Sequence, residues 1–152
     1  MFQKGEFLNV QKYEIKEFIG KGEYGQVYKV AEKSTGNIYA AKILSEGLND
    51  DEPFSLTSIR REIGILSRVQ YKSILKFIGY SPINFEQELN PVIFTEYLPH
   101  GSLDSLIDLE KQNKAPSNWN MTKKLINIFG IASAMAYIHS KNIIHRDLKP
   151  GN

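Results

Sequence analysis

Three stretches rich in apolar, β-branched and aromatic residues follow one another early in the chain, with only short turns between them. They cover residues 13–19, 27–30 and 38–44, and the first alternates large apolar with charged side chains. Such stretches predict strands. Strands joined by short turns pair antiparallel, because a parallel return needs a crossover of a dozen or more residues. The chain is therefore predicted to begin as an antiparallel meander.

Two more strands and a helix are predicted in the next part of the chain. Residues 74–80 and 92–97 are the strand candidates. Before them, Ile59, Ile63 and Leu66 recur at helical spacing. The first part of the chain should therefore contain about five antiparallel strands and one helix.

Helices dominate the remainder. A short helix is predicted from Leu103 to about Lys111, and a longer one over residues 122–140. The longer helix is apolar nearly all round, and such a helix is expected to be buried among several neighbours. Residues 1–12 are mixed in character and predict a loose lead-in. The fold class predicted from these elements is α+β.

Composition excludes several classes of protein. The 152 residues are 41% hydrophobic and 24% charged with a net charge of +2, which is typical of a globular protein and gives no argument for nucleic acid or an anionic membrane. There is no cysteine, so a reducing, intracellular (cytoplasmic) location is expected. The sequence has neither a signal peptide pattern nor an apolar run long enough to span a membrane.

Gly20, Gly22 and Gly25 form a Gly-x-Gly-x-x-Gly pattern that is followed by Val27. Glycine removes the side chain that would keep a phosphate from the backbone amides. Two alternatives are a plain hairpin turn and the dinucleotide-binding fold, in which the third glycine opens a helix. Residues 26–30 predict a strand instead, and no Walker Gly-Lys-Ser/Thr follows. The pattern therefore favours a glycine flap between two antiparallel strands.

Lys42 and Glu62 are a candidate ion pair. Lys42 lies in an apolar strand, where a buried ammonium needs a partner. Glu62 lies among the apolar positions of the predicted helix and could point back toward the sheet. The alternative makes Lys42 a surface lysine with its charge in water and Glu62 a solvated charge. Their order after the glycine pattern favours the pair.

The last eight residues, 145–152, read His-Arg-Asp-Leu-Lys-Pro-Gly-Asn. They place an acid, two cations and an amide close together, behind two isoleucines. This combination suits a substrate hydroxyl and a metal-bound phosphate.

Taken in order, these motifs resemble a eukaryotic protein kinase domain. The resemblance covers nearly the whole chain, from about Tyr13 to Asn152. Lys149, two residues after Asp147, resembles serine/threonine kinases rather than tyrosine kinases. Segments 77–80 and 96–103 look like the tyrosine-kinase-like group. The motifs that carry the resemblance are the glycine loop, Ala40-x-Lys42, Glu62, Thr95-Glu96-Tyr97 and residues 145–152.

The resemblance implies a lead-in (1–12) and a kinase domain at residues 13–152. Within it, 13–95 would be the small N-terminal lobe, 96–102 the hinge and 103–152 the start of the large C-terminal lobe. The implied reaction is transfer of the γ-phosphoryl group of ATP to a Ser or Thr hydroxyl of a protein, with ATP and Mg²⁺ as cofactors.

In the small lobe, the resemblance implies a role for each matched residue. Ala40 would press on the adenine together with the valine of the glycine loop. Lys42 would hold the α and β phosphates and be oriented by Glu62. The residues that would cover the nucleotide are Gly20, Gly22, Gly25 and Val27.

At the hinge, Thr95 matches the gatekeeper behind the adenine pocket. The backbone groups of Glu96 and Leu98 would bond the adenine edge, so their side chains are expected to matter less than their peptide groups. Ser102 falls where many kinases contact the ribose, and Asp104 is a second candidate.

In the final segment, Asp147 would accept or orient the proton of the substrate hydroxyl, and Lys149 would steady the transferred phosphoryl group. Asn152 would bind magnesium. The resemblance makes His145 structural, and Arg146 would pair with a phosphorylated activation loop.

The sequence contains no Asp-Phe-Gly, whose aspartate holds the main magnesium ion in this family. The expectation is therefore a kinase domain truncated after the catalytic loop and inactive alone. The alternative is a non-catalytic, pseudokinase-like module that binds nucleotide or exposes its apolar helix to a protein partner.

Overall fold

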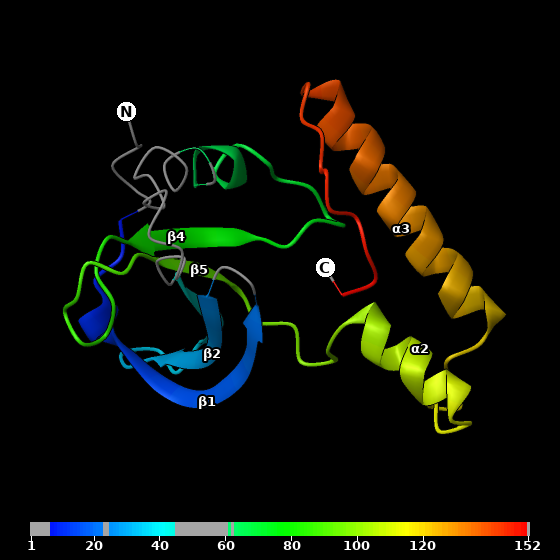
Figure 1. Ribbon diagram of the computed structural model, residues 1–152, viewed down its shortest axis with the longest axis horizontal. Helices are drawn as coiled ribbons and strands as arrows, with labels where there is room; N and C mark the ends of the chain where they lie inside the picture. The colour runs from blue at the N-terminus through cyan, green and yellow to red at the C-terminus, as the bar shows by residue number, and fades with distance from the viewer. Residues whose placement is uncertain (1–6, 23–24, 45–60, 62, 152) are drawn as a thin grey trace, which may run out of the picture. The chain divides into compact units, whose positions relative to one another are not determined.

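The computed structural model describes residues 7–22, 25–44, 61 and 63–151. They form two compact units (Figure 1). The first contains residues 1–70 and 75–97, and the second contains residues 71–74 and 98–152. Each unit is described by itself.

The first unit is built on an antiparallel sheet with strand order β1-β2-β3-β5-β4 (Figure 1). Consecutive strands pair with one another except β3 and β4, because β5 lies between them in the sheet. The prediction of an α+β chain with about five antiparallel strands is confirmed. The strands are β1 (Tyr13–Gly22), β2 (Gly25–Glu32), β3 (Ile38–Leu44), β4 (Phe77–Ser81) and β5 (Val92–Glu96).

Among the strand boundaries that differ from the prediction, the end of β1 and the start of β4 have a clear structural reason. β1 continues through the first two glycines to Gly22, because Gly20 and Gly22 still pair with β2. β4 begins at Phe77 rather than at residue 74, because residues 71–74 belong to the second unit. The chain therefore leaves the first unit briefly before β4 begins.

The prediction of a loose lead-in was wrong for residues 7–12. The 3₁₀ helix η1 (Val10–Lys12) is capped by Asn9, whose side chain accepts a hydrogen bond from the Gln11 N–H. The Leu8 N–H donates to the Tyr80 carbonyl at 2.8 Å, and Val10 is only 1% exposed. One apolar side chain inserted into the core is enough to order this segment.

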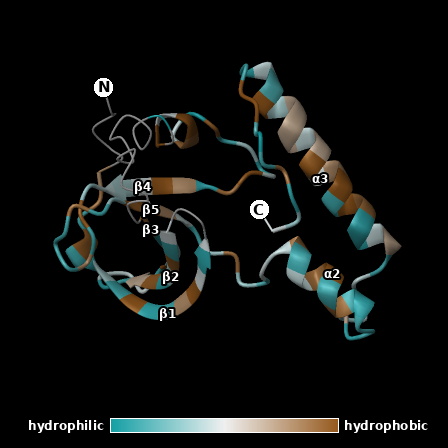
Figure 2. Ribbon diagram, in the orientation of Figure 1, coloured by the Kyte–Doolittle hydropathy of each residue, from teal (hydrophilic) through white to brown (hydrophobic). Residues whose placement is uncertain are grey.

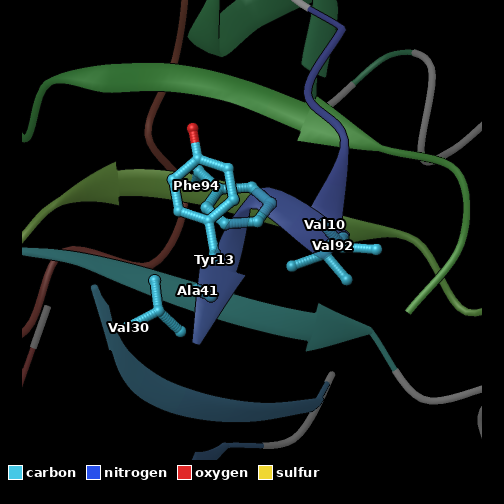
Figure 3. Close-up of a cluster of buried hydrophobic side chains, with 6 residues drawn as sticks. All are labelled: Val10, Tyr13, Val30, Ala41, Val92 and Phe94. Carbon is cyan, nitrogen blue, oxygen red and sulfur yellow. The ribbon is translucent and has the colours of Figure 1, made fainter. Parts of the chain in front are cut away.

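A hydrophobic cluster covers one face of the sheet (Figure 3). Ala41 on β3 is paired with Phe94 on β5, and the Phe94 ring lies 4.7 Å from that of Tyr13. Side chains from the N-terminal segment and from the connection before β5 pack against the cluster. Its buried members are Val10, Tyr13, Val30, Ala41, Val92 and Phe94.

The opposite face carries a second cluster, because successive side chains of a strand point to opposite sides. Ile93, next to Phe94, packs there with Leu44 and Tyr80. Residues 61 and 63–66 are helical, and Ile63 is buried in this cluster. The predicted helix therefore covers the face of the sheet that also carries Lys42.

The second unit contains α2 (Leu103–Lys111) and α3 (Met121–Ser140), close to their predicted ranges. Of the side chains of α3, only Ala134 and Ile138 are buried. Hydrophobic residues run along much of the helix (Figure 2), and Phe129 is 69% exposed. The expected burial among several neighbours is therefore not met in the described part of the chain. Among the described residues, no helix is long and apolar enough to cross a membrane.

Candidate functional site: a glycine hairpin and one face of the sheet

The glycine pattern forms the end of the β1–β2 hairpin. Gly22 is opposite Gly25, and Gly20 is opposite Val27. Residues 25–32 form strand β2, so the expected flap between antiparallel strands is confirmed and the helix required by the dinucleotide-binding alternative is absent at this place. Residues 23 and 24, at the tip, lie outside the described residues.

The three glycines differ in whether the surrounding structure requires a residue without a side chain. Gly25 has φ +149°, and a Cβ added to it would collide with the backbone carbonyl of Ile43 on β3. This residue lets two backbones approach closely. A Cβ added to Gly20 or Gly22 would meet no atom within 4 Å. Packing within the described residues therefore does not require these two glycines, and they leave open space beside the backbone.

The register of the sheet places four of the residues predicted to bind the nucleotide in two cross-strand pairs. Val27 on β2 is opposite Lys42 on β3. One step further along β3, Ala40 is opposite Thr95 on β5. Residues two apart on a strand share a face, so these four side chains lie on one side of the sheet. All four are half-buried.

Glu62, the predicted partner of Lys42, lies outside the described residues. Residues 63–66 are helical, and Ile63 and Leu66 pack with Leu44 and Ile93. These contacts bring the helix against the face that carries Lys42. The Lys42–Glu62 pair remains a prediction.

At the end of β5, Glu96 is tied to Lys76, the residue before β4. The Glu96 N–H donates to the Lys76 carbonyl at 3.0 Å, and the Lys76 N–H donates to the Glu96 carboxylate at 2.7 Å. The next residue, Tyr97, has its ring 5.0 Å from the ammonium of Lys29 on β2. That ammonium also pairs with Glu17 on β1 at 3.7 Å.

Leu98, Ser102, Asp147 and Lys149 lie in the second unit. The Ser102 hydroxyl caps α2 by accepting the Ser105 N–H at 3.2 Å. This cap is a sufficient structural reason for a serine here. The predicted ribose contact of Ser102 therefore remains untested, and Asp104 is exposed. Leu98 is the first residue of this unit after the sheet and is also exposed.

The segment after α3 carries the acid and the lysine of the final motif. Lys149 Nζ lies 2.8 Å from an oxygen of Asp147, and both side chains are largely exposed. The backbone carbonyl of Pro150 accepts a hydrogen bond from the Asp104 N–H at 3.0 Å, which fixes the segment to the start of α2. Arg146 has φ +66°, a conformation that non-glycine residues rarely adopt.

The predicted magnesium ligand Asn152 lies outside the described residues. Across the ranges that the structure describes, no group of three or more His, Asp or Glu side chains could hold a metal ion. The residues do fit the phosphates of a nucleotide. Gly20 and Gly22 leave space beside β1, and Lys42 supplies a cation on β3, opposite Val27 of β2.

Sequence reasoning missed two groups of contacts around the site. One is the carboxylate of Glu96 on the Lys76 N–H, together with Lys29 under Tyr97. The other is the stack of Tyr71 on Tyr137, whose rings lie 4.8 Å apart at 15°. No sequence signal marks a backbone N–H as a partner, but an acid directly after an apolar strand was a visible hint.

The first unit is an antiparallel sheet with a glycine hairpin, and the second is helical and carries the acid–lysine segment. The family model described as "Protein kinase domain" matches residues 13–152. The chain belongs to the protein kinase family.

Curated relatives agree with this assignment. The chain is 33% identical over 150 residues to an Aurora kinase of Saccharomyces cerevisiae, covering 98% of the chain and 38% of that protein. It is 34% identical over 143 residues to serine/threonine-protein kinase 10-A of Xenopus laevis, covering 93% and 14%. A probable serine/threonine-protein kinase of Dictyostelium discoideum is 29% identical over 150 residues, covering 99% and 28%. The chain therefore spans about a third of these relatives or less.

Proposed function

We propose that this chain supplies the ATP-binding lobe and the catalytic loop of a serine/threonine protein kinase. The reaction transfers the γ-phosphoryl group of ATP to a protein Ser or Thr hydroxyl. ATP and Mg²⁺ are the cofactors, and a protein is the substrate. The proposal includes an intracellular location and no role for nucleic acid or a membrane. A closer kinship with the tyrosine-kinase-like group also remains a prediction.

One observation carries the proposal: the strand register sets Val27 opposite Lys42 and Ala40 opposite Thr95 on one face of the sheet. A small side chain such as Ala40 beside a β-branched residue leaves room for a flat ring. A cation two residues away along β3 suits the phosphates attached to that ring. The supporting relatives are named as serine/threonine kinases.

In the proposed reaction, some residues bind the phosphates and others act on the substrate hydroxyl. When bound, ATP and Mg²⁺ supply the transferable phosphoryl group and neutralise its charge. Lys42 holds phosphate oxygens, and the glycine hairpin excludes water above them. Asp147 orients the substrate hydroxyl and accepts its proton. Lys149, 2.8 Å from Asp147, steadies the charge on the phosphoryl group.

The test is transfer of labelled γ-phosphate from ATP to Ser- and Thr-containing peptides by the intact protein that carries this chain. Asp147→Asn keeps the size of the side chain and removes its basicity, so the rate should fall about 10²–10⁴-fold. Lys42→Met should reduce transfer, and Asp108→Asn, an exposed position on α2 with no predicted role, serves as the control. Transfer that survives Asp147→Asn, or that goes to tyrosine only, would contradict the proposal.

A polypeptide limited to the 152 residues contains no Asp-Phe-Gly aspartate. We expect it to transfer no phosphoryl group and to bind ATP weakly or not at all. Magnesium-dependent transfer by this polypeptide that disappears in Asp147→Asn would overturn this expectation. So would a rise in melting temperature with MgATP that is lost in Lys42→Ala.

The second candidate is a pseudokinase-like module without phosphoryl transfer. The observation that favours it is the exposed apolar side of α3, where Leu125, Ile126, Ile128 and Phe129 are each more than half exposed. The same transfer assay separates the two candidates, since the module predicts no activity in the intact protein under any condition.

A further inference from the structure

Glu96, the last residue of β5, uses its side chain where an antiparallel ladder normally uses a backbone carbonyl. In a hydrogen-bonded pair, two opposite residues exchange both of their N–H···O bonds. The Glu96 N–H makes its half of the exchange, to the Lys76 carbonyl at 3.0 Å. The Lys76 N–H donates to the Glu96 carboxylate oxygen Oε1 at 2.7 Å. The side chain of Glu96 thus replaces its own backbone carbonyl as the acceptor.

The carboxylate is a stronger hydrogen-bond acceptor for the Lys76 N–H than the backbone carbonyl that it replaces. A hydrogen bond to a charged acceptor is shorter and stronger than one between neutral groups, and 2.7 Å is in the charge-assisted range. The Lys76 N–H therefore has a good partner without using the Glu96 backbone carbonyl. No backbone donor is left unsatisfied by the change.

The displaced carbonyl is held only loosely. It accepts a hydrogen bond from the Thr95 hydroxyl at 3.3 Å. This is long for an O–H···O bond, which is usually 2.5–3.0 Å. A hydroxyl can also rotate to another acceptor. A ligand N–H can therefore take this carbonyl at little cost.

The residue after Glu96 is fixed from the other side. The Tyr97 ring lies under the Lys29 ammonium, which is itself 3.7 Å from the Glu17 carboxylate. The backbone at positions 96 and 97 is thus tied to the start of β4 by one residue and to β2 by the next. The carbonyl between these two ties has a set direction.

We propose that Glu96 is a positioning residue: its carboxylate occupies the Lys76 N–H so that its own carbonyl stays available to a ring amino group of the ligand. The 6-amino group of adenine is a donor of this kind. The inference rests on the proposed function, since that supplies the nucleotide. It assigns a role to a side chain that sequence reasoning expected to matter less than its peptide group.

The acceptor exchange is tested first, without any ligand. In the intact protein, the NMR signal of the Lys76 amide proton should move upfield in Glu96→Gln, because a neutral amide oxygen is a weaker acceptor than a carboxylate. Glu14→Gln, which changes an exposed carboxylate on β1, should leave the signal in place. A Lys76 amide signal that does not move in Glu96→Gln, or moves equally in Glu14→Gln, overturns the inference.

The consequence for the ligand is tested with two nucleotides, MgATP and MgITP, which carry an amino group and an oxygen at the same ring position. In Glu96→Ala the carbonyl can return to the Lys76 N–H. We expect about a three- to tenfold loss of ATP affinity, the effect of one hydrogen bond, with ITP affinity nearly unchanged. Glu96→Gln should restore most of the preference for ATP.

A purely structural role of Glu96 predicts a different result. Both nucleotides would then weaken by the same factor in Glu96→Ala, and this outcome overturns the inference. If the unmodified protein binds neither nucleotide, the proposed function fails instead. The Lys76 amide signal in the Glu96 and Glu14 variants then decides the acceptor exchange by itself.

Discussion

The sheet unit and the helical unit differ in how much apolar surface each buries. The sheet has a cluster on each face, and both contain side chains that are at most a few per cent exposed. In the described part of the helical unit, the only buried apolar side chains are Ala134 and Ile138. Burial of apolar area is the dominant favourable term in folding. The sheet unit therefore contains the packing that stabilises its own fold.

This difference bears directly on the candidate site. Val27, Ala40, Lys42 and Thr95 stand on strands whose other face is packed around Phe94. In the acid–lysine segment, the Pro150 carbonyl accepts a hydrogen bond from the Asp104 N–H, and the Asp147 and Lys149 side chains are largely exposed. We therefore expect the four residues on the sheet to be more rigid than the segment around Asp147.

The largest effect should come from the core of the sheet. Phe94 is fully buried between Tyr13 and Phe85, so Phe94→Ala should lower the free energy of unfolding by about 3–5 kcal/mol. Urea denaturation followed by tyrosine fluorescence or circular dichroism measures this change. The matched control is Phe129→Ala on α3, which should stay within about 0.5 kcal/mol. Equal losses in the two variants would remove the contrast between the units.

The next effect should come from the glycine hairpin. Gly25→Ala places a methyl group against the Ile43 carbonyl at a positive φ, so it should destabilise the sheet by more than about 1 kcal/mol. Gly22→Ala, opposite it in the same hairpin, meets open space and should leave the fold intact. Thermal melts of the two variants make the comparison. A tolerated Gly25→Ala would mean that β2 and β3 are not in such close contact there.

The helical unit offers a smaller effect, in the stack of Tyr71 on Tyr137. A double-mutant cycle with Tyr71→Leu and Tyr137→Leu should give a coupling free energy of about 0.5–1.5 kcal/mol. Amide exchange in residues 71–74 should accelerate in both single variants. Additive effects would show that the stack does not hold this segment to α3.

The smallest effect is a pH dependence at the connection between the two helices. The Lys124 ammonium and the Trp119 indole N–H hydrogen-bond to Glu110, and together they hold the pKa of that carboxyl below its usual value. A lowered pKa in the folded state means a contribution that is complete above the unfolded-state pKa and is lost as pH falls through the folded one. Glu110→Gln should reduce the loss of α3 helicity on acidification. An identical acid transition in the variant would contradict this.

Sequence pattern predicted most of the framework, and the misses have physical reasons. Apolar and β-branched stretches between turns predicted five strands, and the apolar pattern predicted α2 and α3 to within a residue or so. The order of residues 7–12 was missed because Val10 is a single apolar residue in a mixed segment, and only the folded sheet supplies its pocket. The late start of β4 was missed because sequence does not reveal which unit residues 71–74 join.

The candidate site was predicted in part. The resemblance to the protein kinase family named Lys42, Ala40 and Thr95, and the strand register then set them on one face. The role of Glu96 could not be read in advance, because its partner is the backbone N–H of Lys76, and every residue but proline has such a group. Contacts of this kind become visible only when the register is known.

Residue-resolved amide hydrogen exchange tests the central contrast between the two units most directly. The amides of Ala41 and Phe94 should exchange only through global unfolding, while those in the first half of α3, around Phe129, should exchange through openings of lower free energy. The expected difference is about 2 kcal/mol or more in the free energy of opening. Protection around Phe129 equal to that of Phe94 would contradict the account.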